Sequence, residues 1–251
     1  MARELKRFAA IADIHSNIAA LKATLADIER RGCKTIVNLG DIVSGPLHPR
    51  ETADLLMSLN LPTVRGNHER QLATLDPAAM GPSDRFAYDV MTEAQRRWIA
   101  GLPVSIEIGV DILLLHGGPK DDLAYLLETV TPSGCRPATE AEVEQRLAGV
   151  EHPLILCGHT HLPREMRLRD GRFIVNPGSV GLPAYEEVSP YLHRNETGAP
   201  HARYAILEKT ADGWRAEFVQ VAYDWAAASA LAGARGRLDW AGALLTGRAS
   251  P

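Results

Sequence analysis

The stretch FAAIADIH, residues 8–15, decides the fold because an apolar run of strand length ends abruptly in polar side chains. Residues 8–12 predict a buried strand, and the loop after it carries Asp13 and His15. Apolar residues then recur at helical spacing across residues 18–28. The chain therefore opens as a strand, a polar loop and a helix.

The same pattern repeats further along the chain. Residues 35–39 predict a second strand that ends at Asp41, residues 51–59 predict a helix, and residues 62–64 predict a third strand that ends at the sequence GNHE, residues 66–69. Strands that alternate with helices pair in parallel, and ligands in such sheets collect beyond the carboxyl ends of the strands. We therefore expect the polar clusters to meet at one edge.

The rest of the sequence continues an α/β pattern without an internal repeat. The expected elements are mainly helix over 70–100, a hairpin over 106–115, a helix over 139–149 capped by Thr139, strands over 154–157, 172–175, 203–207 and 214–221, and a helix from Asp224. Residues 185–202 predict an irregular excursion. We expect one domain over residues 1–251, with a helical tail from about residue 224.

Composition narrows the class of protein. Hydrophobic residues make up 45% and charged residues 23% of 251 residues, which is ordinary globular usage. The net charge of −4 argues against an extended nucleic-acid interface. Cys33, Cys135 and Cys157 form no CxxC pair, and no stretch approaches the ~20 apolar residues of a membrane span. We expect a cytoplasmic protein that is not attached to a membrane.

Histidine, aspartate and asparagine recur where apolar strands end, and this is how a metal site is assembled. A carboxylate such as Asp41 can bridge two cations. Asp13 and His15 are two residues apart, as are His159 and His161, so each pair can point the same way in an extended segment. A set without thiolates suits Mn, Fe, Zn or Ni better than a structural zinc site.

These residues resemble the calcineurin-like metallophosphoesterases, a family with five ordered motifs. The motifs stand here as Asp13-Ile14-His15, Gly40-Asp41, Gly66-Asn67-His68-Glu69, His116 and Gly158-His159-Thr160-His161. The run from Asn176 to Gly181, with the sequence NPGSVG, is similar to the small bacterial phosphodiesterase branch. The resemblance extends from residue 8 to about residue 180.

The resemblance implies a four-layer α/β/β/α sandwich of two mixed sheets and a site for two metal ions. The implied ligands are Asp13, His15 and His161 for the first ion, Asn67, His116 and His159 for the second, and Asp41 as the bridge. His68 would face the substrate phosphate outside the metal shell, as a general acid or a stabiliser of the transition state. Strands 172–221 are expected to build most of the second sheet.

One departure from the family concerns the orientation of His68. Many members continue the second motif as G-D-x-x-D, and the second aspartate orients the histidine that corresponds to His68. Ser44 stands at that position here. We therefore expect His68 to lack help from a carboxylate, and substrates with good leaving groups to be favoured.

The leading expectation is hydrolysis of a small nucleotide or organic phosphodiester by a hydroxide that bridges the two metals. The sequence leaves open phosphomonoesters, including phosphoproteins, as the substrate, and a non-catalytic metal-binding scaffold as a more distant alternative.

Several residues outside the motifs are expected to be structural. His48, His152, His193 and His201 are interpreted as solvated or turn histidines, and Cys157 as core packing. Ser179 lies in no G-x-S-x-G motif, so a turn explains it better than a role as a nucleophile.

Overall fold

The first sheet is built around β1 (Arg7–Ile11), which lies parallel to β2 (Ile36–Asn38) and antiparallel to β12 (Ala202–Thr210). Strand β13 (Gly213–Val221) completes the order β13-β12-β1-β2. Four of the five residues of β1 are fully buried, because both faces of this sheet are covered. The computed structural model describes residues 5–249.

The second sheet has the order β3-β4-β7-β9-β8. Its strands are β3 (Ile106–Ile108), β4 (Ile112–Leu114), β7 (Leu154–Leu156), β9 (Phe173–Asn176) and β8 (Arg164–Arg167). Strands β4, β7 and β9 run parallel, whereas β3 and β8 are antiparallel edge strands. The parallel strands therefore deliver their carboxyl ends to one edge.

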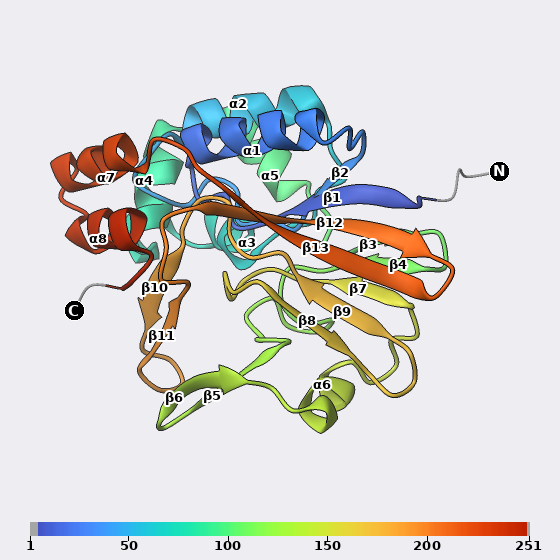
Figure 1. Cartoon of the computed structure of the whole chain (residues 1–251). Helices are drawn as coiled ribbons and strands as arrows, with labels where there is room; N and C mark the ends of the chain where they lie inside the picture. Colours follow the sequence, from blue (N-terminus) through green and yellow to red (C-terminus); the bar gives the residue numbers. More distant parts are fainter. Residues whose placement is uncertain (1–4, 250–251) are drawn as a thin grey trace.

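The two sheets pack face to face between helices, as Figure 1 shows. Phe8, Leu114, Leu156 and Leu207 belong to the apolar cluster between the sheets. Helices α1 (Ile18–Arg30) and α2 (Pro49–Leu59) cover the outer face of the first sheet, and α6 (Glu140–Arg146) lies outside the second. The predicted four-layer α/β/β/α sandwich is confirmed.

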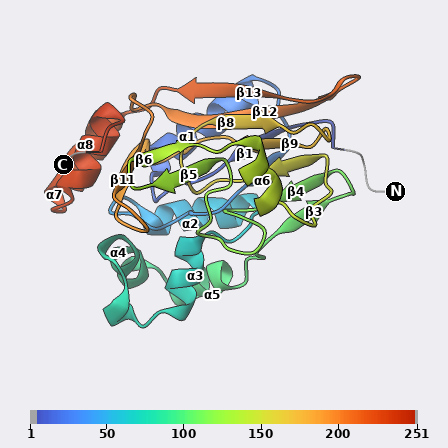
Figure 2. The same cartoon turned by 90° about the horizontal axis from the view of Figure 1, so that it is seen from below.

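Smaller elements surround one end of this sandwich (Figures 1 and 2). They are α3 (Asn67–Thr74), the 3-10 helix η1 (Pro77–Ala79), α4 (Pro82–Val90), α5 (Glu93–Ala100), the hairpins β5–β6 (Glu128–Thr131, Gly134–Pro137) and β10–β11 (Ala184–Glu187, His193–Glu196), α7 (Trp225–Ala234) and α8 (Leu238–Thr246). Within residues 5–249, no helix has the length and apolar character needed to cross a membrane.

The structure corrects four local expectations. Residues 62–64 form a single bridge, Asn38 to Thr63, because Pro62 cannot donate to a ladder. The excursion over 185–202 contains the β10–β11 hairpin. The C-terminal helix is two helices, since the chain turns at Gly236 with φ +78°. Strands 172–221 do not build most of the second sheet, because β12 and β13 pair into the first.

Candidate metal centre

The strand ends of both sheets meet at one edge and bring the predicted ligands together. Asp13 follows β1 and Asp41 follows β2 in the first sheet, while His116 follows β4 and His159 follows β7 in the second. The structure gathers these side chains into two groups, Asp13 with His15 and His161, and Asp41 with His116 and His159. Within each group the potential ligand atoms lie within 4.8 Å of one another.

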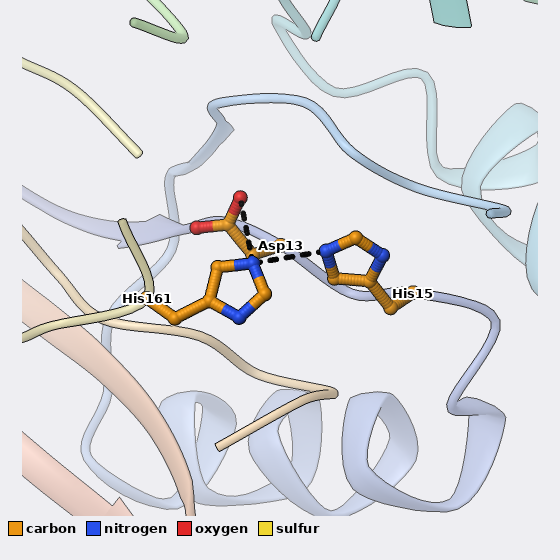
Figure 3. Close-up of side chains that lie close together, drawn as sticks. All are labelled: Asp13, His15 and His161. Atoms are coloured by element: carbon orange, nitrogen blue, oxygen red, sulfur yellow. Dashed lines mark hydrogen bonds and ion pairs between the residues drawn. The ribbon is translucent and has the colours of Figure 1, made fainter. Parts of the chain in front are cut away.

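The first group is the trio drawn in Figure 3, where three side chains point toward a common centre. His15 Nε2 lies 3.0 Å from His161 Nε2, which lies 3.8 Å from Asp13 Oδ1. His15 Nε2 is also 3.9 Å from Asp41 Oδ2, a member of the second group. Asp41 therefore lies between the two groups, where a bridging carboxylate is expected.

The second group includes Asn67, the first residue of α3. His116 Nε2 lies 3.2 Å from Asp41 Oδ2. The end of the Asn67 amide that faces them lies 3.0 Å from His116 Nε2, 3.0 Å from His159 Nδ1 and 3.3 Å from Asp41 Oδ2. The amide can adopt two orientations. If its oxygen faces the histidines, Asn67 offers a ligand to a cation. If its nitrogen faces them, Asn67 donates hydrogen bonds in the metal-free protein.

Backbone carbonyl oxygens fix the tautomers of all four histidines in these groups. The contacts are His15 Nδ1 to Ser44 O at 2.9 Å, His161 Nδ1 to Leu182 O at 2.7 Å, His116 Nδ1 to Leu39 O at 2.7 Å, and His159 Nε2 to Leu123 O at 3.1 Å. A carbonyl oxygen only accepts, so the ring nitrogen beside it carries the proton. In the neutral ring the other nitrogen then turns its lone pair toward the cluster, as in metal-binding histidines.

The electrostatics of the site also fit cations. Burial raises the pKa of Asp13 to about 8, and its Oδ2 has no hydrogen-bond partner. Burial lowers the pKa of His15 to about 4 and that of His159 to about 3, so both imidazoles are neutral. Burial also disfavours a charged His116, but the Asp41 carboxylate outweighs it and raises the pKa of His116 to about 10. In the metal-free protein Asp13 and His116 therefore hold protons, and a bound cation would displace them, because metal ligands must be deprotonated.

Glu69 fixes the loop that carries Asp41, a role that the sequence reasoning missed. The backbone N–H groups of Asp41, Ile42 and Gly66 donate to its carboxylate at 2.8, 2.7 and 2.9 Å. Its side chain is fully buried, and burial raises its pKa. The acidic last residue of the GNHE motif was the available signal.

Most of the predicted ligands lie in left-handed backbone, which corrects the expectation of extended segments. The φ angles are +53° for Asp13, +48° for His15, +53° for Asp41, +71° for His159 and +61° for His161. Residues with side chains rarely adopt this conformation, and it concentrates at functional sites. Because the backbone curls, His159 and His161 point into different groups and do not grip one ion together.

Comparison with known proteins identifies the family. The model of the calcineurin-like phosphoesterase superfamily domain matches residues 7–198. The chain belongs to this superfamily. It is therefore a metal-dependent phosphoesterase, and the resemblance seen in its motifs is confirmed.

Individual relatives agree with this assignment. The phosphoesterase is 28% identical over 240 residues to an uncharacterized protein of Methanocaldococcus jannaschii, with 86% of this chain and 87% of that protein covered. It superposes on a metallophosphoesterase from Sphaerobacter thermophilus with a TM-score of 0.75, at 25% identity, over 97% of this chain and all of the other. A candidate diadenosine tetraphosphatase shares the fold, with a TM-score of 0.56 at 17% identity over 88% of this chain and 96% of that one.

In this phosphoesterase, His68 does have a carboxylate partner, so the expectation drawn from Ser44 is wrong. His68 Nδ1 lies 2.8 Å from Asp84 Oδ1 on α4, and Asp84 is buried. Burial disfavours the charged imidazole, but the carboxylates of Asp41 and Asp84 raise the pKa of His68 to about 9. Ser44 instead accepts from His15 through its carbonyl oxygen.

A cavity of about 1040 Å³ opens over the two groups, and its walls include residues that no sequence motif singles out. Tyr125 and Tyr185 line it beside His159 and His161. Trp240 on α8 also lines it, with its ring centroid 5.8 Å from that of His15. The long sequence separation of these residues explains why pattern analysis missed them.

Residues excluded from the site are mostly structural, with one correction. Ser179 Oγ donates to Asp13 O at 2.7 Å and accepts from Leu182 N at 2.8 Å, so it stabilises a turn. Cys157 is buried in the core. His193, interpreted from sequence as a solvated or turn histidine, is buried in β11, and its Nε2 lies 2.9 Å from the Tyr125 hydroxyl.

Proposed function

We propose that this phosphoesterase hydrolyses a small nucleotide or organic phosphodiester at a site for two transition-metal ions, Mn, Fe, Zn or Ni. One ion would be held by Asp13, His15 and His161, and the other by Asn67, His116 and His159. Asp41 would bind both ions. The observation that carries the proposal is the position of Asp41 between two groups of ligand atoms. Such ions, when bound, activate water and supply positive charge for the phosphoryl oxygens.

The residues of the chain itself contribute position and a proton. In hydrolysis a water oxygen joins the phosphorus, the bond from phosphorus to the leaving oxygen breaks, and that oxygen takes up a proton. His68 is the proposed donor, because it borders the cavity beside Asn67 and the Asp84 carboxylate, 2.8 Å from Nδ1, favours its protonated form. Asp84 holds the ring by accepting from Nδ1, which leaves Nε2 for the leaving oxygen.

The size of the cavity supports a diester over a monoester. A monoester needs room for one organic group, and a diester for two. The cavity continues beyond the ligand groups along α3, α4, α8 and the β10–β11 hairpin. Hydrolysis of phosphomonoesters, including phosphoproteins, is the second candidate, and a non-catalytic scaffold is the third.

The test is metal content together with manganese-supported turnover of a chromogenic diester and of the matching monoester. We expect about two metals per chain and faster turnover of the diester. Asp41→Asn should lose metal and turnover, whereas Asp170→Asn, in an exposed turn, should keep both. Faster monoester turnover would replace the leading function with the second candidate, and metal binding without turnover of either ester would favour the scaffold.

We also propose that residues 1–251 form a single metallophosphoesterase domain in the cytoplasm. The pairing of β1 with β12 supports one domain, because it joins residues 7–10 and 205–208 in one sheet. The free thiols of Cys33, Cys135 and Cys157 support a reducing compartment.

A further inference from the structure

The cavity over the ligand groups is much larger than a phosphoryl group requires. Its volume of about 1040 Å³ matches the upper end of pockets that hold drug-sized organic ligands, roughly 300–1000 Å³. Its walls include the α3–α4 segment, the loop that carries Leu123 and Tyr125, the β10–β11 hairpin and α8. The substrate therefore has room for a sizeable organic group.

The charged side chains of this cavity, outside the ligand groups and the His68–Asp84 pair, are mainly acidic. They are Glu186, Glu187, Asp239 and Arg237. Arg237 is the one arginine or lysine among the cavity-lining residues of the described chain. Its Nε and Nη2 donate to the two carboxylate oxygens of Asp239 at 3.0 and 2.7 Å, and its Nη1 donates to Ser83 Oγ at 2.7 Å.

This distribution of charge disfavours a substrate with a chain of phosphates. Each further phosphate adds negative charge and takes up strong donors, usually arginine or lysine. The charge of Arg237 is already balanced by Asp239. Additional phosphates would lie near the exposed carboxylate of Glu187, whose like charge repels them, whereas Arg194 balances the charge of Glu186 at 2.7 Å.

The cavity instead offers rings and aliphatic side chains. The hydroxyl oxygens of Tyr125 and Tyr185 lie 2.6 Å apart, and Asn195 Nδ2 donates to Tyr185 at 2.7 Å, so these hydroxyls have partners within the protein. Leu75 and Leu123 line the same cavity and are 41% and 49% exposed, although both are large apolar side chains. Such surface favours an apolar planar group.

We propose that the substrate carries a single phosphoryl group joined to an uncharged, ring-bearing group, a nucleoside or an aryl alcohol, that packs against Leu123 and the two tyrosines. This inference rests on the proposed phosphoesterase function and names its substrate class. The ring lies next to the metal-binding histidines, since Tyr125 packs on His159 and Tyr185 on His161, with ring centroids 5.1 and 4.7 Å apart.

Calorimetric binding to the metal-loaded protein tests the ring site independently of turnover. We expect saturable binding of adenosine or of phenol, and which of them binds more tightly separates nucleoside from aryl substrates. Leu123→Ala should weaken this binding roughly three- to tenfold. The matched control is Leu192→Ala, an equally apolar residue that is 61% exposed on the β10–β11 hairpin and does not line the cavity.

Turnover measurements test the second part of the proposal, that the substrate carries only one phosphoryl group. We expect kcat/KM for the phenyl ester of adenosine monophosphate to exceed that for diadenosine tetraphosphate about tenfold or more. Asp239→Asn should lower the ratio of the two kcat/KM values, because it leaves the Arg237 charge unbalanced and available to a further phosphate.

The possible outcomes separate this inference from the proposed function. Equal or faster turnover of the tetraphosphate overturns the inference, and so does failure of both adenosine and phenol to bind. Binding that Leu123→Ala weakens supports it even if no ester is hydrolysed, and that loss of turnover would count against the proposed function.

Discussion

At the scale of single residues, the His68–Asp84 pair shows that the carboxylate partner of a histidine can come from a different position in the chain. The family pattern places a carboxylate three residues after Asp41, where this chain has Ser44. The structure supplies a carboxylate from α4, with 2.8 Å between Asp84 Oδ1 and His68 Nδ1. The imidazole therefore has the same kind of partner, although it comes from a different element.

Asp84→Asn should lower kcat about 10- to 100-fold while KM and metal content stay near the wild-type values. Asparagine can still accept from His68 Nδ1, so the ring stays in place, but the negative charge that supports the imidazolium is lost. The decrease in kcat should be larger for esters whose leaving group is a poorly acidic alcohol. Steady-state kinetics over a series of leaving groups, with metal analysis, measures it.

The matched control for this variant is Asp89→Asn. Asp89 lies on the same helix, where it is exposed and pairs with Arg85 at 2.8 Å. The Asp89→Asn variant should leave kcat and KM unchanged. A decrease in kcat that does not depend on the leaving group would show that Asp84 stabilises α4 and does not assist proton transfer.

At the scale of elements, the strand–loop–helix units could be predicted from sequence, and the walls of the cavity could not. Apolar runs such as 8–12 and 154–157 have strand length and end in polar residues, so periodicity alone located the loops after β1 and β7. The hairpin β10–β11 escaped prediction because its four-residue strands are mostly polar and lack an apolar alternation. The left-handed loop conformation also has no pattern of apolar residues to predict it.

The loop after β2 offers a test of how closely these elements fit. A Cβ atom on Gly66 would lie 2.1 Å from Asp41 Oδ1 and 2.6 Å from Asp41 N. Gly66→Ala should therefore displace Asp41, lower the free energy of unfolding by about 3 kcal/mol and reduce metal content. Urea denaturation and metal analysis measure the two effects.

Gly81→Ala is the comparison for this variant. Gly81 precedes α4 with φ −62°, and a Cβ atom there meets nothing within 4 Å. The Gly81→Ala variant should have the stability and metal content of the wild-type protein. If Gly66→Ala behaves in the same way, the close approach between Gly66 and Asp41 does not limit this loop.

At the scale of the whole molecule, the metal site joins the two sheets. Asp13 and Asp41 follow strands of the first sheet, and His116 and His159 follow strands of the second. Ions held by these residues, as proposed, would add to the apolar contacts that hold the sheets together. Metal binding should therefore be coupled to the stability of the entire fold.

Metal at a hundredfold excess over its Kd should stabilise the folded protein by about 2.7 kcal/mol per site, which raises Tm by roughly 5–10 °C. Differential scanning fluorimetry of stripped and reloaded protein measures the shift. Asp41→Asn should lose most of it. An unchanged Tm in the wild-type protein, with metal bound, would mean that the unfolded chain binds metal equally well.

The distribution of ligands over both sheets also sets an order of events during synthesis of the chain. The first ligand is residue 13 and the last is residue 161, and β1 lacks its neighbour β12 until residue 210 has been made. While the ribosome is still adding these residues, the emerging segment holds isolated imidazoles and carboxylates, which bind metal weakly. We therefore expect metal to be acquired late, after translation has passed the second sheet, and incomplete chains not to retain it.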